Sequence, residues 1–332
     1  MNSTSSVEAG LDDCLRLNAL RQGRGVFDAG AEKEKARKLG VRLIPASDPL
    51  YPDLLRCVAG APPILYCLGE PPTAKDTLAF VGSRRPTPYG CRMARRLAGE
   101  AVRSGFAVVS GLARGIDTES HTAALDAGGV TWAVLGSSLD RVYPPENDAL
   151  ARRIAASGGC VLSELPFGSP PLPENFPKRN RIVSGLSWGT VVVEGRIRSG
   201  SLITARLAMD QGRAVFAVPG PIDSPLSEAP HLLIGEGAKL VSSIADIVID
   251  LPPGCQAASL AARSRRQPQK PSPLAQPQEK ILELIGSGSA TMEELALGMG
   301  LDLSGLSNIL LELELQGLIF AVPGQRYAKK AS

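Results

Sequence analysis

Apolar positions are most regular between residues 78 and 248, where short apolar runs alternate with longer segments of helical periodicity. The runs LAFVG, FAVVSG, TWAVLG, CVLSE, TVVVEG and AVFAVPG have no polar alternation, which is typical of strands buried on both faces. Apolar residues of segments 88–104 and 115–127 recur on one helical face. Strands that alternate with helices predict right-handed crossovers and a mostly parallel, doubly wound, Rossmann-like α/β sheet. Its last helix is expected within residues 237–248.

The flanking sequence follows other patterns, so we expect four parts. Residues 1–70 form an N-terminal helical segment and lead-in, proline-rich in its second half, with a single expected strand at 64–68; it should pack on the Rossmann-like domain of residues 71–250. Residues 251–276 are rich in proline, glutamine and serine and carry four cations but no acid, which predicts a flexible basic linker. Residues 277–330 have the pattern of three helices and a two-stranded ribbon, a winged-helix domain.

Composition favours a globular protein of about two domains. Of the 332 residues, 44% are hydrophobic, and the net charge of +3 means that a nucleic-acid site must come from local clustering. The six cysteines form no CxxC pair, as is usual for reduced thiols in the cytoplasm. Neither a signal-peptide pattern nor an apolar window of ~18 residues is visible, so we expect a cytoplasmic protein without a membrane span.

A cationic turn follows the apolar run TVVVEG. Arg196 and Arg198 precede Ser199, Gly200 and Ser201, and a segment with helical periodicity comes next. Backbone N–H groups and the helix dipole favour negative charge at such a strand-to-helix turn, and the hydroxyls and arginines add hydrogen-bond donors. We therefore interpret the turn as a phosphate site, with a solvated basic surface as the alternative.

Two earlier strand-to-helix turns carry similar residues. Gly82-Ser83-Arg84-Arg85 follows the first apolar run, and segment 110–117 follows the second. Glycine allows a ligand to approach the backbone closely, while serine and arginine can hold phosphate. Neither turn has the GxGxxG pattern and no Walker A motif occurs, so we expect no nucleotide cofactor. Asp117 is interpreted as a structural partner of the helix that follows it.

Other catalytic patterns lack the context that they require. The GxSxG match at 185–189 lies between a predicted helix and a strand, whereas a nucleophile elbow needs a strand, a turn and then a helix. His121 and His231 form no recognisable ligand set with the scattered cysteines. We therefore expect no catalytic residue, no metal and no cofactor.

Six motifs stand in order along the chain: VGSRRPTPYG, SGLARGIDTESHTAAL, GSSLDRVYPPEN, FPKRNRIVSGLS, VVVEG and RSGSLITARLAMDQGRAVFAVPG. Together they resemble the DprA (Smf) family of DNA-processing proteins of natural transformation, over about residues 60–250. The resemblance implies a Rossmann-like core with an N-terminal helical domain and a C-terminal winged helix. It also implies a homodimer that binds single-stranded DNA, loads the RecA recombinase on it during recombination, and has no enzymatic activity.

The resemblance places a DNA-binding pocket on these motifs. Matched position by position, the pocket includes Ser83, Arg84, Gly111, Arg114, Lys178, Arg179 and Asn180, with Arg181 and the turn Ser199-Gly200-Ser201 as further members. The turn glycines Gly82 and Gly115 would let a strand approach the backbone, and Phe176 would either stack a base or belong to the core. Because loops at the carboxyl ends of parallel strands meet at one sheet edge, we expect the cations of these motifs to lie in one groove as surface residues, namely Arg84, Arg114, Lys178 and Arg179.

Alternatives to this function remain open. A related Rossmann-like group hydrolyses the N-glycosidic bond of nucleoside monophosphates, and Glu194 would be the catalytic residue if this chain shared that activity. A duplex-reading winged helix would need basic or amide side chains on its third helix, which carries Glu312 and Glu314 and no cation, so we expect this domain to bind protein or to be structural. Segment 229–234, APHLLI, departs from the family pattern Gly-x-Asn-x-Leu-Ile, near the surface implied for the dimer and for RecA.

Overall fold

The computed structural model describes residues 2–252, 255, 276–286, 288–301, 303–315, 318–322 and 326–329. The chain divides into two compact units, Met1–Ser264 and Arg265–Ser332, and each has a hydrophobic core of its own. The predicted basic linker at 251–276 lies almost entirely outside the described residues. No helix in the described part of the chain is long and apolar enough to cross a membrane.

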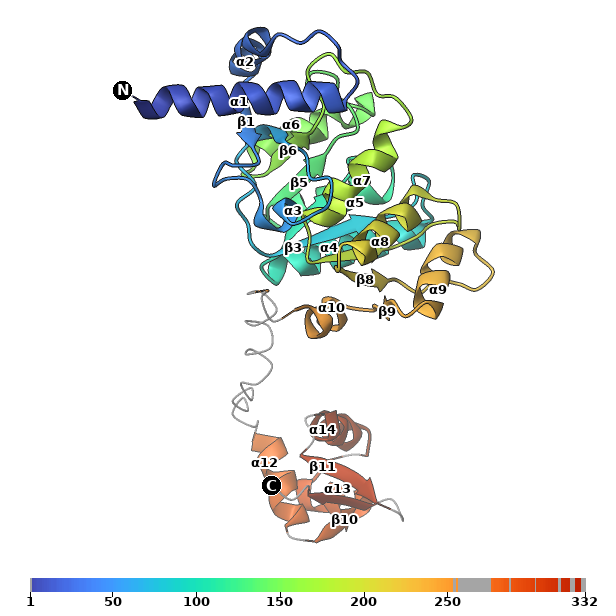
Figure 1. The fold of residues 1–332 in the computed structure, drawn as a ribbon. Coiled ribbons are helices and arrows are strands. Elements are labelled where there is room, and N and C mark those ends of the chain that lie inside the picture. Colours follow the sequence, from blue (N-terminus) through green and yellow to red (C-terminus); the bar gives the residue numbers. More distant parts are fainter. Residues whose placement is uncertain are drawn as a thin grey trace. The chain divides into compact units, whose positions relative to one another are not determined.

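A nine-stranded sheet forms the centre of the first unit (Figure 1) and has the order β1-β2-β6-β5-β4-β3-β7-β8-β9. All neighbours from β6 to β9 in this order pair in parallel, which confirms the predicted Rossmann-like sheet. The strands are β1 Val41–Pro45, β2 Ile64–Gly69, β3 Thr77–Val81, β4 Ala107–Ser110, β5 Thr131–Val134, β6 Cys160–Ser163, β7 Gly189–Val192, β8 Ala214–Ala217 and β9 Lys239–Leu240.

The antiparallel edge of this sheet has one strand more than the sequence predicted. The prediction of a single strand in the proline-rich lead-in is wrong, because β1 pairs antiparallel with β2, and β2 pairs antiparallel with β6. β1 is short and ends at Pro45. An edge strand tolerates proline, since one side of its backbone has no ladder partner.

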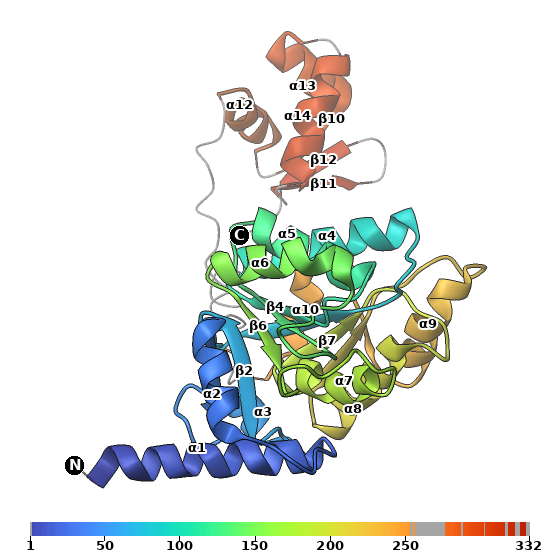
Figure 2. The same ribbon diagram turned by 90° about the horizontal axis from the view of Figure 1, so that it is seen from above.

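Helices cover both faces of the sheet (Figure 2), with α4, α5 and α6 on one face and α7 and α8 on the other. The alternation along β3 explains the two layers, because Leu78 and Phe80 pack in one core and Ala79 and Val81 pack in another. The last helix, α10, ends two residues beyond its predicted limit. The helices are α1 Asn2–Arg21, α2 Ala29–Lys38, α3 Asp53–Arg56, α4 Pro88–Arg103, α5 Ile116–Asp126, α6 Asp148–Ala156, α7 Asn175–Gly185, α8 Gly200–Asp210, α9 Glu228–Gly235 and α10 Ile244–Asp250, with 3₁₀ helices at Pro145–Asn147 and Pro225–Ser227.

The N-terminal helices pack on the antiparallel edge, as predicted. Leu15 of α1 and Ala29 of α2 share a core with Ile64 and Tyr66 of β2. The Tyr66 hydroxyl donates a hydrogen bond of 2.9 Å to Glu32 of α2. Burial raises the pKa of Tyr66, and the Glu32 carboxylate adds to this effect, so the hydroxyl keeps its proton. The lead-in therefore forms part of the first unit.

The second unit has the winged-helix arrangement of three helices and a small sheet. The prediction of a two-stranded ribbon is incomplete, because β10 adds a third strand in the order β10-β12-β11. A capping box of Thr291 and Glu294 starts the second helix. Its elements are α12 Gln276–Ile285, β10 Ser289–Thr291, α13 Met292–Met299, α14 Leu303–Leu315, β11 Ile319–Val322 and β12 Arg326–Lys329.

Candidate nucleic-acid interface

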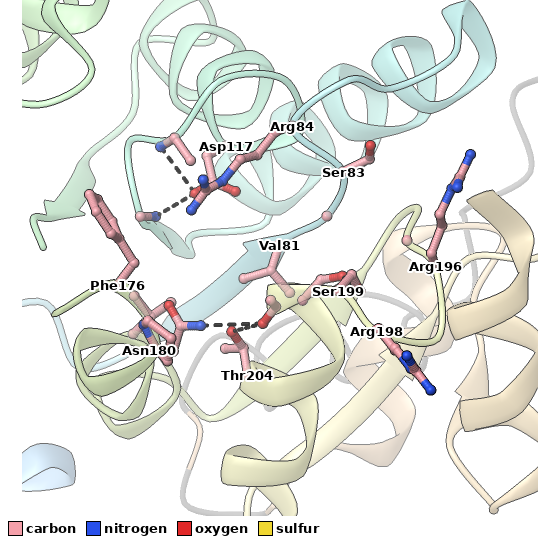
Figure 3. A pocket seen from close by; sticks show the side chains of 18 of the residues that line it. Val81, Ser83, Arg84, Asp117, Phe176, Asn180, Arg196, Arg198, Ser199 and Thr204 are labelled. Atoms are coloured by element: carbon pink, nitrogen blue, oxygen red, sulfur yellow. Dashed lines mark hydrogen bonds between the residues drawn. The ribbon is translucent and has the colours of Figure 1, made fainter. Parts of the chain in front are cut away.

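A cavity of about 550 Å³ lies at the carboxyl edge of β3, β4 and β7 (Figure 3). The three strand-to-helix turns that the sequence singled out meet there with the start of α7, as the parallel topology requires. Most of the predicted site residues line it: Gly82, Ser83, Arg84, Gly111, Phe176, Arg179, Asn180, Ser199, Gly200 and Ser201. Arg114, Gly115, Lys178 and Arg181 do not.

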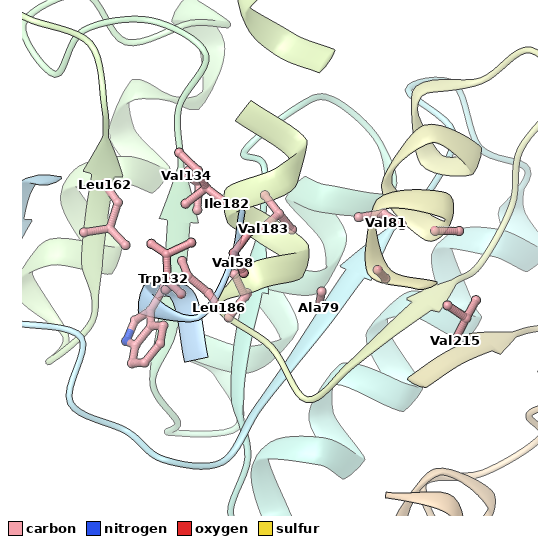
Figure 4. Packing of buried hydrophobic residues seen from close by; sticks show 14 of the residues in the cluster. Val58, Ala79, Val81, Trp132, Val134, Leu162, Ile182, Val183, Leu186 and Val215 are labelled. Atoms are coloured by element: carbon pink, nitrogen blue, oxygen red, sulfur yellow. The ribbon is translucent and has the colours of Figure 1, made fainter. Parts of the chain in front are cut away.

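Apolar packing on the sheet positions α7 beside this cavity. Ile182, Val183 and Leu186 pack in one cluster with Trp132 and Val134 of β5 (Figure 4). This packing leaves the first turn of α7, which carries the FPKRN motif, at the end of the strands. Val183, which lies further along the same helix, also lines the cavity. The core therefore determines where the polar residues of α7 are presented.

The N-terminus of α8 forms one wall of the cavity. Ser199 is the N-cap of this helix: its hydroxyl accepts a hydrogen bond of 3.4 Å from the Leu202 N–H and lies 2.7 Å from the Ser201 hydroxyl. The Asn180 side chain donates to the Gly200 carbonyl oxygen over 3.2 Å and connects α7 to this turn. The dipole of an eleven-residue helix and the N–H groups of its first turn favour an anion here.

Arginine dominates the charge of the cavity. Its five lining arginines are Arg84, Arg85, Arg179, Arg196 and Arg198. The only carboxylate among the lining residues, Asp117, accepts hydrogen bonds from the N–H groups of Gly111 (3.1 Å) and Ala113 (3.2 Å). As predicted, Asp117 therefore has a structural role in the second turn. The excess of positive charge suits a ligand with several phosphates.

Arg179 differs from the surface cation that the sequence predicted, because only 5% of it is exposed. Its guanidinium donates hydrogen bonds to the carbonyl oxygens of Gly111, over 2.6 Å, and of Val134. Burial lowers the pKa of Arg179 to about 10, so the side chain is still charged at neutral pH. The expectation that Arg179 is a surface residue of the groove is wrong, since its side chain is buried and connects α7 to the ends of β4 and β5.

Gly111, near the start of the second strand-to-helix turn, has a packing role that matches the burial of Arg179. A Cβ on Gly111 would lie 2.5 Å from a guanidinium nitrogen of Arg179. Gly111 therefore makes room for a buried side chain of the protein itself. Gly115 lies outside the cavity. Two features require glycine there: its φ is positive, at 76°, and a Cβ would lie 2.3 Å from the Ser83 carbonyl oxygen.

Phe176 lies at the rim of the cavity and is half-buried. Its ring centroid is 5.6 Å from that of Tyr143, and the Arg84 guanidinium lies 5.5 Å from it. The Arg84 contact is a cation–π interaction. Phe176 is thus neither a fully buried core residue nor a free ring.

The predicted cations outside the cavity have other surroundings. Arg114 is exposed and forms an ion pair with Glu146. Arg181 forms a bidentate pair with the buried carboxylate of Glu164, over 2.8 and 2.7 Å. Lys178 is exposed on α7. Of the four cations that were expected in one groove, Arg84 and Arg179 line the cavity, whereas Arg114 and Lys178 do not.

Glu194, the residue that a hydrolase would use, is buried and has structural partners. Its carboxylate accepts hydrogen bonds from the Thr87 N–H (2.9 Å) and the Thr87 hydroxyl (2.5 Å) at the N-terminus of α4. A Cβ on Gly90 would lie 2.3 Å from this carboxylate, so the residue packs closely on the helix. Glu194 does not line the cavity. Within the described residues, no three His, Cys, Asp or Glu side chains form a possible metal site.

The sequence assigns three further arginines of the cavity to phosphate-binding turns but not to the DNA-binding pocket implied by the resemblance. Arg85, Arg196 and Arg198 line the cavity and are exposed. Their position in the strand-to-helix turns was the available signal, since the turn after β7 had already been interpreted as a phosphate site.

The fold and the cavity define a Rossmann-like protein with a cationic site at the carboxyl edge of its sheet, joined to a winged-helix unit. The family model described as DNA recombination-mediator protein A matches residues 42–252, and the DprA winged helix domain matches residues 265–325. The chain therefore belongs to the DprA/Smf family of DNA-processing proteins.

Individual relatives agree with this assignment. Protein Smf of Escherichia coli (strain K12) is 42% identical over 283 residues, which cover 85% of this chain and 76% of the relative. DNA processing protein DprA of Bacillus subtilis (strain 168) is 42% identical over 218 residues, covering 65% and 73%. The X-ray structure of DprA from Streptococcus pneumoniae has a TM-score of 0.63 and 40% identity, covering 68% of this chain and 79% of that one. A structure of DNA processing protein A from Helicobacter pylori, which concerns the single-stranded DNA binding mode of that protein, has a TM-score of 0.56 and 29% identity. The match covers 64% of this chain and 93% of that one.

Proposed function

We propose that this protein binds single-stranded DNA in the cavity and, as a recombination mediator, loads the RecA recombinase on the bound strand during natural transformation. The observation that carries the proposal is the set of five arginines around the N-terminus of α8. Lysine and arginine contacts to phosphate supply most of the affinity of sequence-independent DNA binding. The H. pylori relative, whose structure concerns single-stranded DNA, supports the choice of ligand.

The shape of the site favours a single strand over a duplex. A cavity of about 550 Å³ is of the size that encloses a small ligand, and α7 and α8 both contribute to its walls. A flexible strand can place one or two of its nucleotides in such a cavity, whereas a duplex is rigid and keeps its phosphates on the outside. The protein should therefore bind oligo-dT more tightly than the matching duplex at equal salt.

Membership of the DprA/Smf family supports a proposal about the wider role of this protein. We propose a homodimer in the cytoplasm that hands its strand to RecA and has no enzymatic activity of its own. The structural partners of Glu194 support the absence of hydrolase chemistry. RecA loading would be measured as the rate at which RecA begins to hydrolyse ATP on single strands, with and without this protein. An unchanged rate would contradict the loading role but not the DNA binding.

Two arginines of the cavity provide the sharpest test of the binding site. Fluorescence anisotropy with labelled oligo-dT at several salt concentrations should show weaker binding by Arg84→Ala and by Arg198→Ala. Each replacement should reduce the slope of log affinity against log salt by ~0.7, the value for one phosphate contact on a single strand. Arg206→Ala is the matched control, because Arg206 is exposed on the same α8 but does not line the cavity. Equal effects of all three variants, or equally tight duplex binding, would contradict the proposal.

A further inference from the structure

A row of aromatic and cationic side chains continues from the rim of the cavity onto the outer surface. It consists of Arg84, Phe176, Tyr143 and Arg114, and we call it the rim row. The Arg84 guanidinium lies over the Phe176 ring, and the Phe176 ring contacts that of Tyr143. Tyr143 and Arg114 lie beyond the lining residues of the cavity. The cavity by itself therefore does not include the second ring of this row.

The two rings of the row are oriented differently. Their centroids are 5.6 Å apart and their planes are inclined by 56°. One planar base can lie flat against only one of them, so the two rings suit two different bases of a strand. Tyr143 is only half-buried, and stacking on an exposed aromatic ring tolerates any base. Tyr143 is thus the next ring beyond Phe176 on the outer side of the cavity rim.

Arg114 and its partner Glu146 stand beside this ring. Their side chains are 51% and 49% exposed. Hydrogen bonding to Glu146 raises the pKa of Arg114, and Tyr143 contributes to the same effect. An ion pair this exposed to water contributes little to stability, so a phosphate can replace Glu146 at a small cost. Glu146 is thus the ion-pair partner of Arg114 when no strand is bound.

The loops that carry these residues are held together by a buried side chain. Asn147, next to Glu146, donates hydrogen bonds of 2.9 Å to the Leu112 carbonyl oxygen and of 2.9 Å to the Thr118 hydroxyl. Only 6% of Asn147 is exposed. The turn that carries Arg114 and the loop that carries Tyr143 are therefore in a fixed relation before any ligand arrives.

We propose that Tyr143 and Arg114 form a second nucleotide subsite for single-stranded DNA, adjacent to the cavity, in which the ring stacks a base and the guanidinium replaces Glu146 by a strand phosphate. The inference rests on the proposed function, since it concerns a strand that already occupies the cavity. It assigns to Tyr143 a binding role, and to Glu146 a role as a competitor of the phosphate.

The stacking role is tested with Tyr143→Leu and Tyr143→Phe in the full chain, using labelled oligo-dT of about 20 nucleotides, longer than the ~4–16 that single-strand folds occupy. The variant Tyr143→Leu loses one stacked base, so its affinity for the strand should be about five- to 150-fold lower. The salt slope should not change, because no phosphate contact is lost. Tyr143→Phe keeps the ring and should retain most of the affinity. Thermal melting of both variants identifies a loss of affinity that comes only from misfolding.

The competition is tested with Glu146→Gln. Removing the competing charge should strengthen binding, because Arg114 no longer has to break an ion pair with Glu146 before it contacts a phosphate. Glu174→Gln is the matched control: Glu174 is an exposed carboxylate just before α7 whose side chain caps no backbone group. It reports the general effect of removing one negative charge near the cavity.

The outcomes separate this inference from the proposed function. If Arg198→Ala weakens binding but Tyr143→Leu does not, or if Glu146→Gln and Glu174→Gln behave alike, the second subsite is overturned and the cavity stands. If Tyr143→Phe loses as much affinity as Tyr143→Leu, the ring is not a stacking partner and the subsite is also overturned. If the unmodified protein does not bind oligo-dT at all, both proposals fall.

Discussion

Burial gives arginines of the same cavity different roles. Arg198 is exposed in a turn and can meet a ligand, whereas Arg179 is buried and donates its hydrogen bonds to carbonyl oxygens of β4 and β5. A buried cation without such acceptors would cost several kcal/mol. Arg179 is therefore part of the framework of the site, and its charge still contributes to the potential in the cavity.

His121 supplies a prediction at the scale of one residue. It is fully buried on α5, its Nδ1 lies 2.7 Å from the Thr131 hydroxyl, and burial lowers its pKa to about 3. Because the folded pKa lies below the unfolded value of ~6.5, the unfolded state binds the proton first, and stability falls as the pH drops below ~6.5. One such histidine should cost about 2 kcal/mol at pH 5 relative to pH 7 or above. Urea denaturation at pH 7.5 and pH 5 measures this loss.

The variant His121→Asn removes the titrating group while it keeps a polar atom near Thr131. Its free energy of unfolding should change less between the two pH values than that of the unmodified protein. An equal pH dependence in both proteins would show that other groups are responsible.

At the scale of elements, one carboxylate joins three parts of the first unit. Glu164 follows β6; its side chain forms the bidentate pair with Arg181 of α7 and lies 3.4 Å from Gln22, which follows α1. Its backbone carbonyl oxygen accepts a 2.7 Å hydrogen bond from Asn18 of α1. The N-terminal helix and the site helix are thus both attached to the end of β6.

Breaking the ion pair between Arg181 and Glu164 should lower the free energy of unfolding. The side chains of Arg181 and Glu164 are 23% and 7% exposed, so Glu164→Gln leaves a mostly buried cation with a weaker partner. We expect a loss of about 2 kcal/mol in the free energy of unfolding, measured by urea denaturation. Asp148→Asn, which breaks the exposed pair with Arg152, is the control and should cost less than about 0.5 kcal/mol. Similar losses in both variants would mean that Glu164 does not join these elements.

At the scale of the whole molecule, the chain consists of two units with separate cores. Among the described residues, the core of the second unit consists of residues from 281 onward, and none of them belongs to a cluster of the first unit. Cys255 is fully buried and belongs to a core of the first unit, so a truncation at residue 254 would remove a core residue. The division after Ser264 is the better place to cut.

A variant that ends at Ser264 should fold by itself, because its clusters lose no member. Circular dichroism should detect a single cooperative thermal transition, as expected for a domain with a complete core. Oligo-dT binding through the cavity should also persist. An insoluble product, or a melt without a cooperative transition, would place the boundary elsewhere.

The sequence by itself determined the repeating architecture. Apolar runs and helical periodicity are local signals, and they placed the strands from β3 to β8 and the helices between them. The order of the six motifs, together with parallel topology, also brought three turns to one sheet edge. The same signals are too weak for short edge strands such as β1 and β10, whose pairing energy comes from partners elsewhere in the chain.

Only the tertiary structure decided what each polar side chain does. Arg179 contacts the Gly111 carbonyl oxygen 68 positions away, and Glu194 contacts Thr87 over 107 positions. Arg114 and Glu146 are 32 positions apart and pair only because two loops meet. Burial and hydrogen-bond partners depend on which distant segments come together, and no local pattern encodes this. The sequence therefore predicted which turns meet at the cavity, and the fold separated its buried residues, such as Arg179, from exposed ones such as Arg198.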